Sequence, residues 1–423
     1  MARTGWVRLS VAALVLVLAG GCTDAPDGAR PAPHPVSIEA DHPDALADQA
    51  VRLRITGLEP QAEVTVTART TDYLDTTWQA QATFVADQQG TVDLSTTAPR
   101  SGSYQGVDGM GLFWAMNPSP AEADGAYFIT RYPQLEGSYQ VHLTVDTGGR
   151  QQAARALERR WTATGVTARR LTLAADGVTG ELFRPPPGPA RRPAVLVFGG
   201  SEGGTSQNFT AALLASHGYP ALSLGYFALP GLPPTLQDVP LEYFATAARL
   251  LAAETGADPA RLLAMGYSRG SEAALLLAQH YPDLVHGTVV YAPAARVHAG
   301  FPSGPTAWTL GGAPVPTGTI PLDRVTGPVL AIAGADDELW PSADSAEQIA
   351  RAIAPDGPPH RALVYPGAGH LVGTFPYLAM DTTPANTAAG RTNRYGGTRA
   401  GNAAAQAAGW RQVLALLAGL RSG

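Results

Sequence analysis

The 423-residue sequence predicts an N-terminal all-β sandwich followed by a C-terminal α/β domain with a mostly parallel sheet and helices on both faces. Two observations support this fold class. From about residue 36, short segments alternate apolar and polar side chains, as strands with one buried face do. From about residue 166, continuous apolar runs alternate with helix-like stretches, which is typical of parallel strands buried on both faces.

The sandwich is predicted over residues 36–165. The segments VRLRITGL, EVTVTART, ATFVADQQGTVDL and SYQVHLTVD alternate with a period of two. Gly, Pro and Asp residues separate them, as in a small antiparallel sandwich. The histidines of this half (His34, His42 and His142) are isolated along the chain, so we expect no catalytic constellation in it.

The α/β catalytic domain is predicted over residues 166–423. Its expected buried strands are the apolar runs AVLVFGG, YPALSLGYF, RLLAMGYS, GTVVYAP, PVLAIAGADD and RALVYPGAGH. Helices are expected up to residue 217 after the first run, over 241–255 and over 271–279. Because ligands bind beyond the carboxyl ends of strands in such sheets, the residues that follow these runs are candidate site residues.

Residues 1–22 are typical of a secretory signal. Two arginines give a positive start, and Val11–Ala19 is an apolar core too short to span a bilayer. The stretch VLVLAGGC resembles a bacterial lipoprotein signal, in which the cysteine after the cut is lipidated; that cysteine is Cys22, although Ala19 stands where leucine is usual. Residues 23–35, rich in Pro, Asp and Ala, are predicted to form a flexible tether.

We therefore expect an exported protein, lipid-anchored through Cys22 to the outer face of the cell membrane. Two alternatives stay open: a plain secretory peptide with Cys22 incidental, or a cytoplasmic protein whose signal is not used. Cys22 is the single cysteine of the chain, which excludes an internal disulfide and a cysteine-rich metal site.

The charged residues exclude several further classes of function. The chain contains no lysine, so all 29 basic residues are arginine, and neither a phosphate-binding P-loop nor a Schiff-base mechanism is available. The net charge is -6 without a basic stripe, so no nucleic-acid partner is expected. Because no paired-histidine motif occurs, we expect neither a metal nor a cofactor, and a metal hydrolase is the least favoured interpretation.

A nucleophile elbow is predicted at Gly266-Tyr267-Ser268-Arg269-Gly270. This G-x-S-x-G pentapeptide follows an apolar strand and precedes a helical run, which is the context that the turn requires. The turn is so tight that the residues two before and two after the serine must lack bulk. Ser268 would then project its hydroxyl at a helix N-terminus, where the helix dipole favours developing negative charge. The sequence therefore predicts an α/β-hydrolase domain with Ser268 as its nucleophile.

A serine hydroxyl needs a base, and the base needs an orienting acid. In this fold they follow the nucleophile in the order acid, then histidine. RALVYPGAGH ends in His370, the predicted base. The acid lies in GADDELWPS, where Asp337 is preferred over Asp336 because it is three residues after Gly334. Asp323 is the remaining alternative, expected in a surface loop.

An oxyanion hole requires two backbone amides, one from the residue after the nucleophile. That residue is Arg269. The second amide is expected from the glycine-rich turn at residues 199–204, with Gly200 or Ser201 as candidates. A phosphate loop in this turn is disfavoured, because lysine and the dinucleotide-binding spacing are both absent.

From about residue 35 to the C-terminus the chain resembles the acyl-CoA thioesterase and bile acid-CoA:amino acid N-acyltransferase family. The resemblance is carried by SGSYQGVDGMGLFWAMNP in the first half. In the second half it is carried, in the same order as in the family, by VFGGSEGG, GYSRGSEAALLLA, GADDELWPS, YPGAGH and GGTRAGNAAAQAAGW.

The resemblance implies an immunoglobulin-like N-terminal sandwich, an α/β-hydrolase domain and a triad of Ser268, Asp337 and His370. It also implies hydrolysis of a fatty acyl thioester through an acyl-serine intermediate. Family members that transfer the acyl group to an amino acid tend to carry cysteine as nucleophile, so Ser268 favours water as the acceptor. The Gly/Pro-rich segment 294–321 departs from the family pattern and is expected to be loop-like and to cover the site.

The expected substrate is thus an acyl-CoA-type thioester or a related carboxylic ester. Two enzymatic alternatives remain: transfer of the acyl group to an amine or alcohol, and an extracytoplasmic esterase that does not use coenzyme A substrates. The export signal favours the latter, because coenzyme A thioesters are cytoplasmic. A surface-anchored binding protein without turnover is disfavoured, because every expected member of the triad is present.

Overall fold

The computed structural model describes residues 35–119, 128, 136–188, 191–352, 360–373, 375–380, 382, 385–386, 391–392 and 394–420. The predicted signal, Cys22 and all of the tether except residue 35 lie outside these ranges. Pro35–Gly423 forms one compact unit. Among the helices in the described ranges, none is long and apolar enough to cross a membrane.

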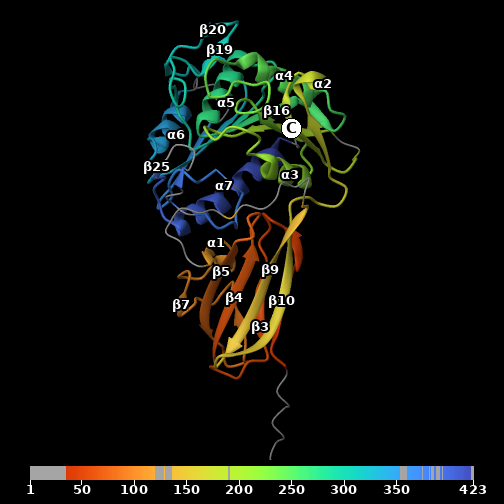
Figure 1. The fold of residues 1–423 in the computed structure, drawn as a ribbon, viewed down its shortest axis with the longest axis vertical. Helices are drawn as coiled ribbons and strands as arrows, with labels where there is room; N and C mark the ends of the chain where they lie inside the picture. The colour runs from red at the N-terminus through yellow and green to blue at the C-terminus, as the bar shows by residue number, and fades with distance from the viewer. Residues whose placement is uncertain are drawn as a thin grey trace, which may run out of the picture. The chain divides into compact units, whose positions relative to one another are not determined.

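Two β-sheets make up the N-terminal part (Figure 1). The smaller has the order β1-β3-β6 and is antiparallel. The larger has the order β2-β10-β9-β4-β5-β7, with β8 also paired to β5, and its β2-β10 pair is parallel. The elements are β1 (Ser37–Ala40), β2 (Asp44–Leu46), β3 (Leu53–Thr56), β4 (Glu63–Thr71), β5 (Thr77–Val85), β6 (Val92–Asp93), β7 (Ser101–Gly102), α1 (Gly111–Trp114), β8 (Asn117–Ser119), β9 (Ser138–Thr147) and β10 (Arg150–Arg160).

Side-chain alternation explains most of these strands. Along β5, Trp78, Ala80, Ala82 and Phe84 are each at most 1% exposed, whereas the residues between them are less buried. The sequence of β10, RQQAARALERR, is too polar to predict a strand. It becomes one because it pairs with β9 along its length. Tertiary pairing, rather than the local pattern, determines its conformation.

A mostly parallel sheet of order β11-β12-β14-β13-β16-β17-β22-β23 forms the centre of the second part. The β11-β12 and β12-β14 pairs are antiparallel, and the pairs from β14 to β23 are parallel. The strands are β11 (Thr167–Leu171), β12 (Thr179–Arg184), β13 (Arg192–Phe198), β14 (Ala221–Gly225), β16 (Ala257–Tyr267), β17 (Thr288–Tyr291), β22 (Val329–Gly334) and β23 (Arg361–Tyr365), with the short helix α2 (Leu173–Asp176) between the first two.

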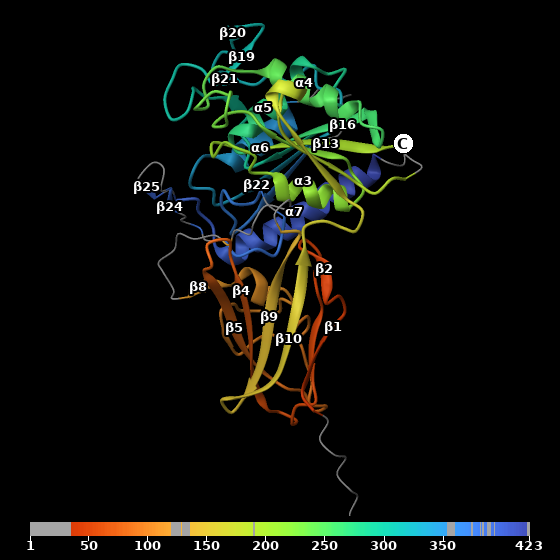
Figure 2. The same cartoon turned by 45° about the vertical axis from the view of Figure 1, so that its right-hand side comes forward.

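Helices cover both faces of this sheet (Figure 1, Figure 2). Val195 and Val197 of β13 belong to one hydrophobic core with α3 (Asn208–Ser216) and α7 (Arg399–Gly419). Their neighbours along the same strand belong to a second core with α4 (Leu241–Ala252), α5 (Arg269–His280) and α6 (Ser342–Arg351). Successive side chains of a strand point to opposite faces, so a continuous apolar run fills both cores.

The core on the α3 and α7 face continues into the β-sheets of the N-terminal part. Trp161, at the end of β10, contacts the rings of Phe209 and Phe375 at 4.4 and 5.3 Å between centroids. Asp48, whose side chain is 1% exposed, accepts a hydrogen bond from Trp410 Nε1 at 2.6 Å and lies 2.6 Å from His217 Nε2. The two halves therefore share one core.

Segment 294–321 is largely irregular, as the sequence predicts, but it contains short paired strands. β18 pairs with β21, and β19 pairs with both β15 and β20. A further short pair, β24-β25, precedes α7. The bounds are β15 (Val239–Pro240), β18 (Arg296–Val297), β19 (Trp308–Leu310), β20 (Ala313–Pro314), β21 (Gly318–Thr319), β24 (Ala385–Asn386) and β25 (Arg391–Thr392).

Candidate active site

Ser268 lies on a sharp turn between β16 and α5. Its backbone has φ 53° and ψ -122°, an uncommon conformation for a residue with a side chain. The flanking glycines permit the turn: a Cβ on Gly266 would lie 2.2 Å from the carbonyl oxygen of Gly270, and one on Gly270 would lie 2.2 Å from that of Gly199. The conformation expected of a nucleophile elbow is thus present.

The structure brings Ser268, His370 and Asp337 together at the carboxyl ends of the strands. Ser268 Oγ lies 3.0 Å from His370 Nε2, and His370 Nδ1 lies 2.9 Å from Asp337 Oδ2. A carboxylate can only accept, so Nδ1 carries the proton and Nε2 is free to accept the hydroxyl proton. The Asp337 side chain is 2% exposed, and His370 is 1% exposed.

Of the three candidate acids, only Asp337 contacts the histidine. Its second oxygen accepts hydrogen bonds from the amides of Leu339 and Trp340, at 2.9 and 3.3 Å, which fix the carboxylate. Asp336 is exposed. Asp323 is also exposed and accepts a hydrogen bond from Gln279, so it lies in the surface environment that the sequence suggests.

The loop after β23 holds His370 by its backbone and by its ring. Its amide donates to the carbonyl of Tyr395 at 2.7 Å, and its carbonyl accepts from the Tyr267 hydroxyl at 3.1 Å. The imidazole stacks on the Tyr395 ring and meets the edge of Trp340, with centroids 5.6 and 5.5 Å apart. These contacts restrict the ring to the orientation in which Nε2 faces Ser268.

The two backbone amides predicted for the oxyanion have different surroundings. Arg269 is the first residue of α5, where amides have no acceptor within the helix. The Gly200 amide, in contrast, donates to both carboxylate oxygens of Glu202, at 3.0 and 2.9 Å. As placed, Gly200 is not a free donor, because the Glu202 side chain folds back over the turn. Ser201 remains the candidate for the second amide.

Tyr226 also binds the backbone of the 199–204 turn, and the sequence did not indicate this role. Its hydroxyl donates to the carbonyls of Gly199 and Gly200 at 2.9 and 2.8 Å. Burial raises the pKa of Tyr226 well above its ordinary value, so the hydroxyl keeps the proton that it donates. The Glu202 carboxylate and the Tyr226 hydroxyl therefore both hold the backbone of the turn beside Ser268.

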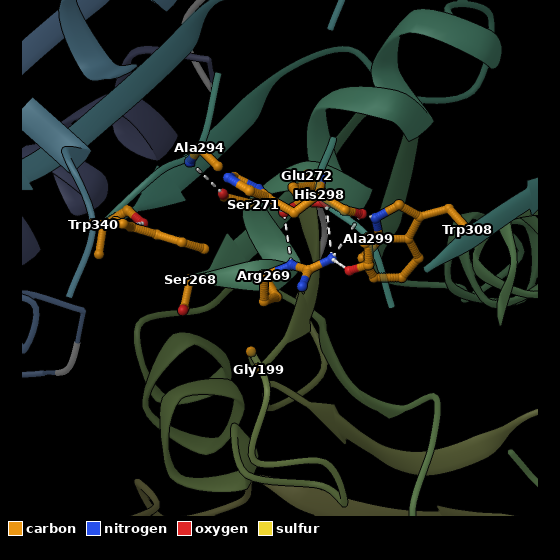
Figure 3. A network of polar contacts seen from close by, with 12 residues as sticks. Gly199, Ser268, Arg269, Ser271, Glu272, Ala294, His298, Ala299, Trp308 and Trp340 are labelled. Atoms are coloured by element: carbon orange, nitrogen blue, oxygen red, sulfur yellow. Dashed lines mark hydrogen bonds and ion pairs between the residues drawn. The ribbon is translucent and has the colours of Figure 1, made fainter. Parts of the chain in front are cut away.

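Sequence reasoning also missed a buried carboxylate next to the elbow (Figure 3). Glu272, in the first turn of α5, is 0% exposed. It lies 2.7 Å from Arg269 Nε and accepts a hydrogen bond from Trp308 Nε1 at 2.8 Å. The remaining member of the group is His298, whose Nδ1 lies 2.9 Å from the same carboxylate. In the sequence, only the i, i+3 spacing of Arg269 and Glu272 hinted at the pair.

No group of three or more His, Cys, Asp or Glu side chains is placed to hold a metal ion within the part of the chain that the structure describes. The chemistry that the arrangement can perform is that of an activated hydroxyl beside backbone amides. Such a site can form an ester with an acyl group and pass it on.

Two stretches of the chain match known family descriptions. Residues 48–172 match "Acyl-CoA thioester hydrolase/BAAT N-terminal region", and residues 309–419 match "BAAT / Acyl-CoA thioester hydrolase C terminal".

Full-length relatives show the same similarity. Acyl-coenzyme A amino acid N-acyltransferase 1 of Mus musculus is 30% identical over 413 residues, covering 89% of this chain and 96% of that protein. Acyl-coenzyme A thioesterase 6 of Mus musculus is 28% identical over 395 residues, covering 86% and 92%. Among solved structures, a hyperthermophilic esterase from Pyrobaculum calidifontis has 22% identity and a TM-score of 0.37, covering 48% of this chain and 77% of that chain.

Proposed function

Because the chain belongs to the acyl-CoA thioesterase and bile acid-CoA:amino acid N-acyltransferase family, we propose that it is a serine hydrolase of fatty acyl thioesters or related carboxylic esters. The relatives support an enzyme of thioester hydrolysis or acyl transfer in general. The observation that carries the serine mechanism is the pair of contacts at Ser268 Oγ–His370 Nε2 and His370 Nδ1–Asp337 Oδ2, 3.0 and 2.9 Å.

In the proposed reaction, Ser268 Oγ attacks the acyl carbonyl while His370 Nε2 takes the hydroxyl proton. Asp337 stays ionised, holds the Nδ1 proton and stabilises the imidazolium that forms. The bond to the leaving group breaks as His370 returns the proton to it, which leaves the acyl group esterified to Ser268. Water then repeats the sequence, giving its proton to His370 and releasing the acid and the free hydroxyl.

The tetrahedral intermediate carries a negative oxygen that needs backbone donors. We assign one to the Arg269 amide and the second to the 199–204 turn, where Ser201 replaces Gly200 as the favoured donor because Glu202 occupies the Gly200 amide. The Ser268 and His370 side chains are almost fully buried. In such a site, donors aimed at the developing charge are worth more than they are in water.

Acyl transfer to an amine is the second candidate. It is favoured by the 30% identity to an acyl-coenzyme A amino acid N-acyltransferase. A serine nucleophile favours water as the acyl acceptor instead, because family members that transfer the acyl group tend to carry cysteine. Both candidates share the acyl-serine and differ only in what attacks it.

The test is hydrolysis by residues 23–423, offering palmitoyl-CoA and p-nitrophenyl esters side by side, with Ser268→Ala as the control. Turnover of the thioester that is lost in the variant would support the family activity. Turnover of simple esters alone would indicate an extracytoplasmic esterase. If neither is turned over and a fluorophosphonate fails to label Ser268, the serine mechanism is wrong.

We further propose that the protein is exported and lipid-anchored at Cys22, on the basis of the signal-like first 22 residues. An exported enzyme would meet esters or thioesters other than coenzyme A derivatives. In the native host, Cys22→Ala is expected to move the protein from the membrane fraction to the soluble fraction, and an unchanged distribution would contradict the anchor.

The N-terminal sandwich is proposed to be immunoglobulin-like, as the family resemblance implies.

A further inference from the structure

Three side chains behind the elbow fasten segment 294–299 to the first turn of α5. Ser271 Oγ accepts a hydrogen bond from the amide of Ala294 at 3.0 Å. The Arg269 guanidinium donates from Nη2 to the carbonyls of His298 and Ala299, at 3.2 and 2.9 Å. Glu272 receives the amide of His298 at 3.3 Å. The position of His298 relative to the nucleophile is thus set by contacts of both its backbone and its side chain.

The charge of Glu272 is already balanced without His298. Its carboxylate is 0% exposed and forms a close ion pair with Arg269, whose side chain is 7% exposed. A buried ion pair of this kind is neutral as a unit. Glu272 therefore does not depend on a second cation to balance its charge, and its contact with His298 acts as a hydrogen bond that orients the ring.

The hydrogen-bond geometry then fixes the tautomer of His298. Nδ1 lies 2.9 Å from Glu272 Oε1, and a carboxylate only accepts, so Nδ1 carries the proton. In a neutral ring the other nitrogen, Nε2, is an acceptor. The side chain is 39% exposed, and its Nδ1 edge is the one turned to the buried carboxylate. The accessible edge is therefore the one that bears Nε2.

The His298 ring is linked to His370 through the indole of Trp340. The His298 ring stacks on Trp340, with centroids 5.4 Å apart and planes 14° apart. Trp340 in turn meets His370 at 5.5 Å. Figure 3 draws His298 and Trp340 in the same neighbourhood as Ser268. His370 gives its proton to the leaving group, so a substrate bound at Ser268 extends its leaving group toward His370.

Resting on the proposed function, we infer that His298 is a specificity-determining residue for the leaving group. Its Nε2 accepts a hydrogen bond from an N–H or O–H donor, and the leaving group that fits best is a thiol carrying an amide a few bonds from sulfur. Glu272 and Trp340 are positioning residues, because they orient the imidazole without touching the substrate. An incoming amine could offer the same donor chemistry, and the experiment separates the two sources.

The experiment compares two thioesters of one acyl chain on the full chain. One has N-acetylcysteamine as its leaving group, which carries an amide N–H, and the other has pentanethiol, which has no donor. We expect the wild-type protein to favour the amide-bearing thioester about five- to tenfold in kcat/KM, the size of one net hydrogen bond, mainly through KM. In His298→Asn, whose side-chain amide can still donate to Glu272 but offers no acceptor at the Nε2 position, this ratio is expected to fall toward one. His298→Gln, whose longer side chain can present an acceptor there, is expected to restore part of it.

His280→Asn is the matched control, since His280 is a partly buried histidine at the C-terminal end of α5, whereas segment 294–299 is held by the first turn of that helix. It should leave the ratio at the wild-type value. A ratio near one in the wild-type protein, or an equal loss on both thioesters in His298→Asn, would overturn the assignment. A transfer product with added glycinamide that disappears in His298→Asn, at an unchanged thioester ratio, would assign Nε2 to the acceptor instead. If the wild-type protein turns over neither thioester, the proposed function fails and the inference falls with it.

Discussion

Replacing Glu272 with alanine is expected to lower the free energy of unfolding by about 3–5 kcal/mol, the usual cost of leaving a buried charge without its partner. The Arg269 side chain is 7% exposed and would lose a carboxylate 2.7 Å from its Nε. Trp308, at 0% exposure, would also lose the acceptor of its indole N–H. The measurement is urea denaturation followed by circular dichroism.

The chain provides a matched control in the Arg184–Glu254 pair. Its Nε–Oε2 distance is also 2.7 Å, but the Arg184 side chain is 36% exposed. Glu254→Ala is therefore expected to cost roughly 1 kcal/mol or less. Equal losses in Glu254→Ala and Glu272→Ala would refute the argument, because Glu272 is the more buried carboxylate and also accepts from the Trp308 indole. The double variant Arg269→Met, Glu272→Met should be more stable than Glu272→Ala, since it leaves no unpaired charge.

Three further predictions concern the elbow, a buried acid and the shared core. Gly270→Ala is expected to lower kcat/KM roughly 100-fold, because the new Cβ would lie 2.2 Å from the Gly199 carbonyl and displace the oxyanion turn; a fluorophosphonate labelling rate equal to wild type would contradict this. Burial raises the pKa of Glu181 from 4.5 to about 7, so the folded state holds a proton that the unfolded state has released between these values. The free energy of unfolding should therefore decrease as the pH rises through this window and level off above it. In Glu181→Gln, denaturation curves should show no such decrease. Asp48→Ala is expected to lower the free energy of unfolding by roughly 3 kcal/mol, because the Trp410 indole N–H loses its carboxylate acceptor at 2.6 Å. An unchanged urea midpoint would show that the contact does not stabilise the fold.

The sequence predicts the six parallel strands of the central sheet, because each combines an apolar run with a turn, but it does not predict β11 and β12, whose sequences TARRL and TGELFR contain no such run. It does so less well where side chains carry no pattern. β10 contains only one apolar residue larger than alanine, Leu157, and is a strand because β9 pairs with it. Pairing of this kind depends on residues far along the chain, which a local period does not reveal.

The three residues of the proposed triad were predictable because each sits at a defined distance from a strand end. The oxyanion donors were less so. Counting positions along the 199–204 turn treats Gly200 and Ser201 alike, and only the folded structure shows that the Glu202 side chain returns to the Gly200 amide. A flexible side chain chooses its partner by geometry in three dimensions, whereas a sequence motif records only the order of residues.

Glu272 and His298 were missed for a related reason. An Arg and a Glu three residues apart on a helix ordinarily form an exposed pair of small energetic value. Here Trp308, from a glycine-rich segment more than thirty residues away, donates to the Glu272 carboxylate. As a result the Arg–Glu pair is buried rather than exposed. The first turn of α5 therefore has two roles: its side chains hold the segment that carries His298, and its backbone is proposed to offer the Arg269 amide to the oxyanion. A substitution in this turn should alter the choice of leaving group as well as the rate, because one short stretch of chain positions both.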